Sequence, residues 1–166
     1  MNGPARIFRL ERFFPYLVRR YYRATSGTVS RIYKSRFGLS VHEWRTMAVL
    51  NDYEPLSAKE IVARSSMDKV NVSRAIASLK RDGRLERHVD PTDRRRALLR
   101  LTGQGKRVMR ELVPLVLAAE QRLLHGLSEA EIAQLESLMR RVEQNAERVL
   151  ADEAPAASDT HEEARA

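Results

Sequence analysis

The sequence contains no cysteine, which excludes disulfide bonds and thiol-based redox sensing. Its seven glycines are scattered at the ends of predicted elements and do not gather into a phosphate-binding loop. No apolar run approaches the length of a membrane span, and the first residues are too polar for a secretory signal. We therefore expect a cytoplasmic protein that makes no contact with a membrane.

Catalytic arrangements are also missing from the sequence. An enzyme needs converging groups, such as a nucleophile with a base or paired carboxylates, and no motif of that kind is present. His42, His88 and His125 lack the local spacing of a metal site or a catalytic triad. We predict a protein that is not an enzyme and that holds no cofactor or metal. A metal sensor built from distant His and Glu ligands stays open as an alternative.

The positive charge is concentrated in the body of the chain. The 166 residues, enough for one domain with additional helices, carry a net charge of +8. Residues 151–166 carry −4, which leaves +12 on residues 1–150. A basic excess favours polyanionic partners such as nucleic acid, although an arginine-rich solvated surface would give the same balance. The order of the predicted elements has to separate these two interpretations.

Three helix starts share the same capping signal. A serine precedes each helix, and a glutamate three residues later can complete a capping box, with a hydrophobic pair flanking each box. The three boxes are Ser40 with Glu43, Ser57 with Glu60, and Ser128 with Glu131. They predict helices that begin near residues 41, 58 and 129.

Long amphipathic helices are predicted at both ends of the chain. Apolar residues three and four apart indicate a helix over residues 10–36 that ends at Gly38, with Pro15 in its first turn or, alternatively, at a kink. The same spacing indicates helices over 103–125, capped by Thr102 and bent at Pro114, and over 129–150. Their apolar faces exceed what one small domain can cover, so we expect a homodimer. The acidic C-terminal tail, residues 151–166, is predicted to be disordered.

The central segment has the pattern of a helix-turn-helix followed by a hairpin. Short helices over 58–64 and 69–82 are joined by four residues, with Asp68 as cap and Gly83 as the end. After Gly83 the apolar period changes to two, which indicates an antiparallel hairpin whose loop, Asp90 to Arg96, is basic. The predicted fold is mainly α: a winged helix-turn-helix with a two-stranded β wing and long N- and C-terminal dimerisation helices. The predicted parts are an N-terminal dimerisation helix (1–38), a winged helix-turn-helix DNA-binding domain (39–102), C-terminal dimerisation helices (103–150) and a disordered acidic tail (151–166).

Several strings resemble the central signature of the MarR family of bacterial regulators. They are Trp44-Arg45, LSAKEIVARSSMDKVNVSRAIASLKRDGRLER and DPTDRRRALLRLT, within residues 39–105. The resemblance implies a two-fold dimer, held by the first and the last two helices, that binds a palindromic operator and often responds to a small aromatic molecule. Phe14-Pro15-Tyr16-Leu17 and Glu43-Trp44-Arg45 resemble a branch that regulates aromatic-acid breakdown, in which some members sense aromatic acyl-CoA thioesters.

The start of the second short helix carries the side chains expected of a recognition helix. Only that end fits deeply enough into the major groove to reach base edges. The candidates are Lys69, Asn71, Ser73 and Arg74. Asn71 could pair with adenine and Arg74 with guanine, or one of them could hold a phosphate. A solvated helix face is the alternative.

The hairpin loop supplies a second set of candidates for DNA contact. The resemblance implies that Arg95 enters the adjacent minor groove and that Asp93 holds it in place. Arg94 and Arg96 are expected to meet phosphates or solvent. Asp93 is alternatively a turn former, because it follows Pro91-Thr92.

A candidate effector site combines aromatic walls with nearby cations, which suits an aromatic carboxylate or a phosphate-bearing thioester. Its candidates on the second helix are His42, Trp44 and Arg45, and those on the first helix are Arg19, Arg20 and Tyr21 with the neighbouring Tyr16, Tyr22 and Arg23. Aromatic residues at helical spacing also form cores and dimer interfaces, and we expect Trp44 in the core. We predict a DNA-binding transcriptional repressor released by a small aromatic ligand. A metal-responsive regulator, or a winged-helix module that binds protein or RNA, is the alternative.

Overall fold

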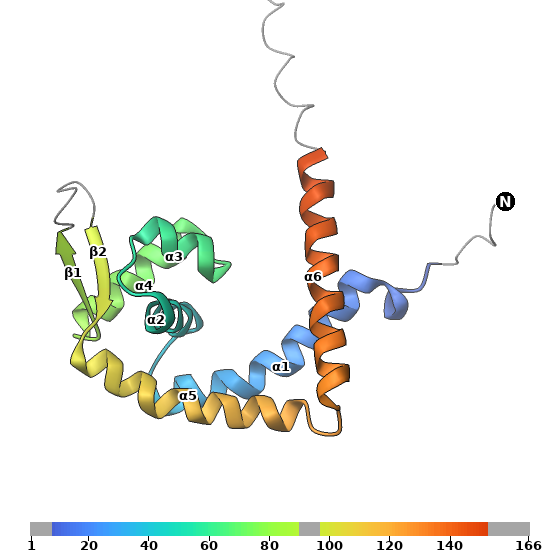
Figure 1. Cartoon of the computed structure of the whole chain (residues 1–166), viewed down its shortest axis with the longest axis horizontal. Helices are drawn as coiled ribbons and strands as arrows, with labels where there is room; N and C mark the ends of the chain where they lie inside the picture. The colour runs from blue at the N-terminus through green and yellow to red at the C-terminus, as the bar shows by residue number, and fades with distance from the viewer. Residues whose placement is uncertain (1–7, 90–96, 153–166) are drawn as a thin grey trace, which may run out of the picture. The chain divides into compact units, whose positions relative to one another are not determined.

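The computed structural model describes residues 8–89 and 97–152 and confirms the mainly α, winged helix-turn-helix fold (Figure 1). Contacts divide the chain into two units, Met1–Leu123 and Leu124–Ala166. The first unit contains a short 3₁₀ turn, five helices and a hairpin: η1 Leu10–Arg12, α1 Phe14–Phe37, α2 Val41–Tyr53, α3 Ala58–Ser65, α4 Lys69–Arg81, β1 Leu85–Val89, β2 Ala97–Leu101 and α5 Gly103–Leu123. The second contains α6, Glu129–Asp152. The basic loop and the tail beyond 152 lie outside the described residues.

The predicted capping boxes are confirmed. At the start of α2, Ser40 Oγ accepts a hydrogen bond from the Glu43 backbone N–H (3.2 Å), while Glu43 Oε2 accepts from the Ser40 N–H (2.7 Å). The same reciprocal pair forms before α3 and before α6. Each box satisfies N–H groups that have no partner inside the helix, so each start is fixed by local chemistry.

The first helix begins four residues later than predicted. The sequence pattern placed its start at residue 10, but residues 10–12 form the 3₁₀ turn and α1 starts at Phe14. Pro15 has no N–H to donate to the preceding turn, so it belongs in the first turn of the helix, as the sequence predicted. Gly38 ends α1 with φ at 65°, the left-handed conformation that glycine adopts without strain.

The core forms where α2, α3, α4 and the hairpin meet. β1 and β2 are antiparallel, with Leu85 opposite Leu101 and Val89 opposite Ala97. Leu56 also pairs with Leu99 through two backbone hydrogen bonds of 3.2 and 2.8 Å. This isolated β-bridge beside the hairpin was not predicted from the sequence. Helix α5 contributes to the core as well, and the most buried apolar side chains are Leu39, Met47, Leu50, Ile61, Val72, Leu79, Met109 and Leu112.

The base of the hairpin is joined closely to the start of α5. The Arg84 carbonyl accepts a hydrogen bond from the Thr102 N–H (3.1 Å), and Thr102 Oγ1 caps α5 by accepting from the Gly105 N–H (3.1 Å), which confirms the predicted cap. Gly105 is buried against the Arg84 carbonyl, where a Cβ atom would stand only 2.2 Å from the oxygen. The chain therefore needs glycine at this crossing.

A carboxylate ties the same junction to α2. Glu54, directly after α2, accepts a hydrogen bond from the Leu101 N–H at Oε2 (2.7 Å) and forms an ion pair with Lys106 Nζ at Oε1 (2.6 Å). The Glu54 side chain is largely shielded from solvent. The end of α2, the end of β2 and the first turn of α5 are thus fixed to one another.

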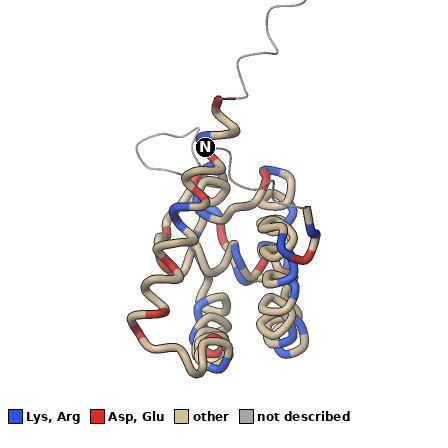
Figure 2. Tube along the Cα trace, turned by 90° about the vertical axis from the view of Figure 1, so that its right-hand side faces the viewer, with Lys and Arg blue, Asp and Glu red and all other residues tan. Residues whose placement is uncertain are grey.

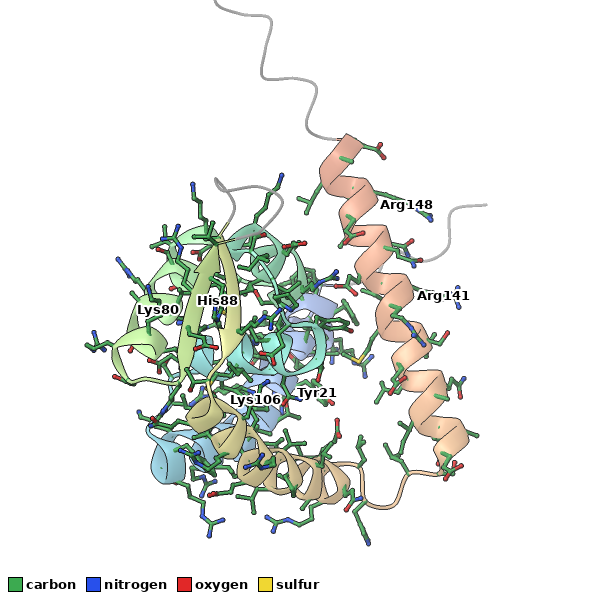
Figure 3. All side chains as sticks on the ribbon, turned by 60° about the vertical axis from the view of Figure 1, so that its left-hand side comes forward. Tyr21, Lys80, His88, Lys106, Arg141 and Arg148 are labelled. Atoms are coloured by element: carbon green, nitrogen blue, oxygen red, sulfur yellow. The ribbon has the colours of Figure 1, made fainter. Side chains whose placement is uncertain are left out.

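Helix α6 is amphipathic but buries none of its side chains within the chain. It ends at Asp152, two residues beyond the predicted boundary at 150. Arg141 and Arg148, seven residues apart, extend from the same side of the helix (Figure 3). Apolar side chains that remain exposed on it are Leu138, Met139, Val142, Val149 and Leu150. Within the described residues, no helix is both long enough and apolar enough to cross a membrane.

Candidate DNA interface

Helix α4 buries one face and exposes the opposite one. Val72, Ala75 and Leu79 form its buried stripe. Three of the four predicted recognition residues lie on the exposed part of the helix: Lys69, Ser73 and Arg74. Figure 2 shows Lys and Arg along most of the described chain, in keeping with 30 cations against 22 carboxylates. The exposed polar face of α4 has the composition that base and phosphate contacts require.

The fourth predicted residue, Asn71, is half-buried and serves the helix cap. Its backbone N–H donates to Asp68 Oδ1 (2.7 Å) and its side-chain Nδ2 donates to Asp68 Oδ2 (2.6 Å). The backbone hydrogen bond from Asn71 is the main cause of the lowered pKa of Asp68. A carboxylate only accepts hydrogen bonds, so Asp68 fixes the orientation of the Asn71 amide. Contact between Asn71 and adenine stays a prediction.

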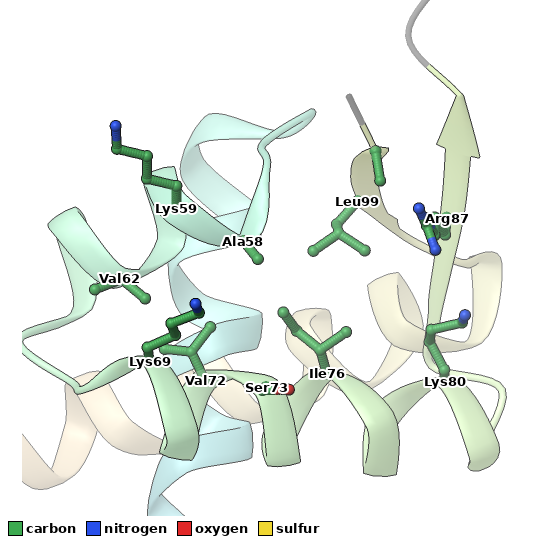
Figure 4. A pocket seen from close by; sticks show the side chains of 11 residues that line it. Ala58, Lys59, Val62, Lys69, Val72, Ser73, Ile76, Lys80, Arg87 and Leu99 are labelled. Atoms are coloured by element: carbon green, nitrogen blue, oxygen red, sulfur yellow. The ribbon is translucent and has the colours of Figure 1, made fainter. Parts of the chain in front are cut away.

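A groove of about 620 Å³ runs between α3, α4 and the hairpin (Figure 4). Its apolar lining includes Val62, Val72, Ile76 and Leu99, and Lys69 and Ser73 border it. Three more cations border the groove: Lys59, Lys80 and Arg87. No carboxylate lines the groove within the described residues, so it carries uncompensated positive charge.

Those three cations were not predicted from the sequence. One signal was available, because Lys69, Ser73, Ile76 and Lys80 follow the spacing of a single helical stripe. Lys59 and Arg87 join this stripe only through the packing of α3 and the hairpin against α4. The predicted wing residues Asp93, Arg94, Arg95 and Arg96 lie outside the described residues.

A buried carboxylate supports α4 from behind. Glu43 is buried, and burial raises its pKa, but hydrogen bonds from the Ser78 side chain and from Ser40 outweigh that effect and leave the pKa below its ordinary value. Ser78 belongs to α4, so Glu43 both caps α2 and holds the recognition helix. Arg84 adds a further link by donating from Nη2 to the Phe37 carbonyl at the end of α1 (2.9 Å).

The predicted effector residues divide between different places. Trp44 is half-buried, packs against the core as expected, and stacks on Tyr33 with ring centroids 6.2 Å apart. Burial raises the pKa of Tyr33. Tyr22 raises this pKa further, though less than burial does, and Arg45 lowers it, so both side chains lie near the Tyr33 hydroxyl. Tyr22 is one of the predicted effector candidates, whereas Tyr33 was not predicted. Tyr33 follows Val29 by four residues on the apolar stripe of α1, which was the available signal.

Other predicted effector residues have neighbours outside the Tyr33–Trp44 pair. Arg20 and Tyr21 line a hollow on the surface of α1, where the Arg20 guanidinium lies 5.9 Å from the centre of the Tyr16 ring. Arg19 is exposed on the same helix. His42 contributes to lowering the pKa of Asp68, after the hydrogen bonds from Asn71, so it lies toward the cap of α4. A ligand site formed by these residues in the dimer stays a prediction.

Metal binding finds no support in the described residues. In residues 8–89 and 97–152, no three His, Asp or Glu side chains come together in a group that could hold a metal ion. The chemistry of this part of the chain is instead that of exposed cations and polar groups on a helix and a hairpin.

A helix-turn-helix with a cationic groove beside an antiparallel hairpin defines the winged helix-turn-helix class of protein. Residues 37–96, which contain α2, α3, α4 and β1, match a family model described as the MarR family. Over these residues the chain is similar to the MarR family of transcriptional regulators. This confirms the prediction of a regulator and not an enzyme, because the family and the matched relatives are regulators.

Similar proteins support the same assignment over most of the chain. The transcriptional repressor IacR of Pseudomonas putida is 26% identical over 140 residues, which cover 84% of this chain and 83% of IacR. BpsR of Bordetella bronchiseptica, whose DNA binding is regulated by 6-hydroxynicotinic acid, is 26% identical with a TM-score of 0.75, covering 85% of this chain and 98% of that one. PcaV of Streptomyces coelicolor, solved with its natural ligand, is 26% identical with a TM-score of 0.72, covering 86% and 99%.

Proposed function

We propose that the protein is a homodimeric repressor that binds a palindromic operator and is released by a small aromatic acid or its CoA thioester. The observation that carries the proposal is the exposed polar face of α4 beside the cationic groove. The first turn of such a helix reaches base edges, while cations at the rim contact phosphates.

Each part of the interface has a distinct role in this proposal. Arg74 pairs with a guanine in the major groove, and Lys69 and Ser73 contact bases or phosphates beside it. The DNA phosphates are bound by Lys59, Lys80 and Arg87. These contacts release counterions and add affinity that does not depend on the base sequence. By the family resemblance, Arg95 enters the minor groove, Asp93 orients it, and Arg94 and Arg96 meet phosphates.

Exposed apolar faces support a dimer. Helix α6 has 24 residues and buries none of them, and the first half of α1 also leaves large apolar side chains exposed. Those on α1 are Phe14, Leu17, Val18, Tyr21 and Tyr22. A second copy of the chain would remove both faces from water. A two-fold dimer places its recognition helices about 34 Å apart, which is why the operator is expected to be a palindrome.

The aromatic effector is supported by side chains and by the relatives. Trp44 and Tyr33 form a stacked pair, and Arg45 is the nearby cation that could bind a carboxylate. BpsR responds to 6-hydroxynicotinic acid, which is itself an aromatic acid. In the dimer, Arg20 and Tyr21 of the partner could complete a site that the single chain leaves open. A ligand that fixes a different spacing of the two recognition helices would release DNA without touching it.

Selection from a random duplex pool tests the DNA-binding half of the proposal. Specific binding should enrich a palindrome, with at least about a thousandfold preference over random duplex at a stated salt concentration. The logarithm of the affinity should fall linearly with the logarithm of salt concentration. Equal affinity for all duplexes would contradict the proposal. Equal affinity for duplex RNA would favour the alternative function, a winged-helix module that binds RNA.

Calorimetry tests the effector half. Benzoates, hydroxycinnamates and their CoA esters are titrated into the protein with and without operator, and a true effector should bind about 5–150-fold more weakly to the DNA complex, because coupling is reciprocal. Arg45→Ala should weaken carboxylate binding, while Lys80→Ala, at the DNA groove, serves as the matched control. Affinity that does not change with operator would exclude this mechanism for that compound.

A further inference from the structure

The exposed face of α4 carries one large apolar side chain, Val70. It is 57% exposed and lies in the first turn, two residues after the Asp68 cap. The buried stripe of Val72, Ala75 and Leu79 faces the opposite way. Val70 is also absent from the apolar side chains that pack against the core. Its isopropyl group therefore takes no part in holding the winged domain together.

Folding gives no reason for valine at this position. A β-branched side chain forms helices less well than alanine, and Val70 gains no burial in return. Its exposed neighbours on the helix, Lys69, Ser73 and Arg74, are all polar. A single exposed valine is unremarkable elsewhere on a surface, but the first turn of a recognition helix is the part that enters the major groove most deeply.

We propose that Val70 is a specificity residue that contacts the 5-methyl group of one thymine in each operator half-site. The inference rests on the proposed function of this face. The thymine methyl is the one apolar group that bases present in the major groove, and the other bases offer polar atoms there. Cytosine has a hydrogen atom at C5 where thymine has the methyl group, so the contact with Val70 selects T over C.

Deoxyuridine provides the decisive test, because it removes the methyl group and keeps the hydrogen-bonding atoms of thymine. Each thymine of the selected operator is replaced in turn, and affinity is measured by fluorescence anisotropy at fixed salt. One position in each half-site should lose about fourfold in affinity, the effect of about 0.8 kcal/mol for one buried methyl-sized group. Substitution at the other thymines should leave the affinity unchanged.

The variant Val70→Ala completes a double-mutant cycle. It should bind the thymine operator about as weakly as the parent binds the deoxyuridine operator, and it should not distinguish the two duplexes. Its thermal stability should equal or exceed that of the parent, because alanine is the better helix former. A merely structural valine would show the reverse: lower stability and an unchanged response to deoxyuridine.

The outcomes separate this inference from the proposed function. If selection yields no preferred sequence, the proposed function fails and the inference fails with it. If a specific operator is found but no thymine responds to deoxyuridine, the Val70 inference alone is overturned. The same holds if Val70→Ala keeps the full deoxyuridine effect, because another residue then contacts the methyl group.

Discussion

Gly105 offers a quantitative test of the packing between the hairpin and α5. A Cβ atom at this position would lie 2.2 Å from the Arg84 carbonyl oxygen and 3.3 Å from Leu101 Cδ2. Contacts under 3.0 Å are essentially never seen, so Gly105→Ala must separate α5 from Arg84 by about 0.8 Å or more. This backbone oxygen accepts a hydrogen bond from the Thr102 N–H, so it cannot shift without moving the chain around it.

The expected cost follows from that displacement. Inserting a methyl group into a close-packed contact costs about 1–3 kcal/mol, which exceeds the gain of about 1 kcal/mol or less from replacing glycine by alanine in a helix. Gly103→Ala is the matched control, because Gly103 lies in the same helix turn, is exposed, and its added Cβ would meet only Arg107 at an ordinary 3.8 Å.

Urea unfolding followed by far-UV circular dichroism measures both variants. Protomer concentration must be the same throughout, because the stability of a dimer depends on it. Gly105→Ala should lower the urea midpoint with little change in the slope, and Gly103→Ala should leave the midpoint equal or higher. If Gly105→Ala were as stable as Gly103→Ala, the close approach of α5 to Arg84 would be wrong.

Three further predictions concern acid stability, assembly and DNA contacts. The lowered pKa of Glu43 stabilises the fold above the unfolded value near pH 4.3, and that contribution is lost as pH falls through the folded pKa. Ser78→Ala removes a hydrogen bond to this carboxylate, so acid unfolding should begin at a higher pH; an unchanged pH profile would argue against the contact. Truncation after Gly126 removes α6 and should abolish the dimer in sedimentation experiments, whereas a stable dimer of that length would contradict the role of α6. Arg74→Ala should change base preference by about 1–3 kcal/mol, while Lys80→Ala should weaken all sequences alike and reduce the salt slope by about one; swapped effects would reverse the two roles.

Local chemistry explains which elements were predictable from the sequence. The capping serines, the Asp68 and Thr102 caps and Gly38 each act within a few residues, so their helix ends were predicted correctly. The predicted start of α1 was wrong because the apolar spacing continues through residues 10–13. Pro15 has no N–H to donate to the preceding turn, so the helical hydrogen bonds do not extend back to residue 10.

The features that the sequence did not predict depend on packing between distant segments. A single residue, Leu56, pairs with Leu99, and one residue is too short for any periodicity to reveal. Lys59 and Arg87 reach the cationic groove from separate elements, and Tyr33 of α1 stacks on Trp44 of α2. The exposed polar residues of α4 could be predicted as one group because they share a helix, whereas the effector candidates are spread over α1 and α2.

The links at the base of the hairpin restrict how the DNA-binding surface can move. Since Glu54, Arg84 and Gly105 fix α2, the hairpin and the first turn of α5 together, the winged part should rotate as one rigid body whenever α5 changes direction. Helix α5 has 21 residues, about 31 Å in length, so a tilt of about 5° displaces one end by about 3 Å relative to the other. That distance is close to the rise of one base pair, and in the proposed dimer it would be enough to move each recognition helix out of register with its half-site.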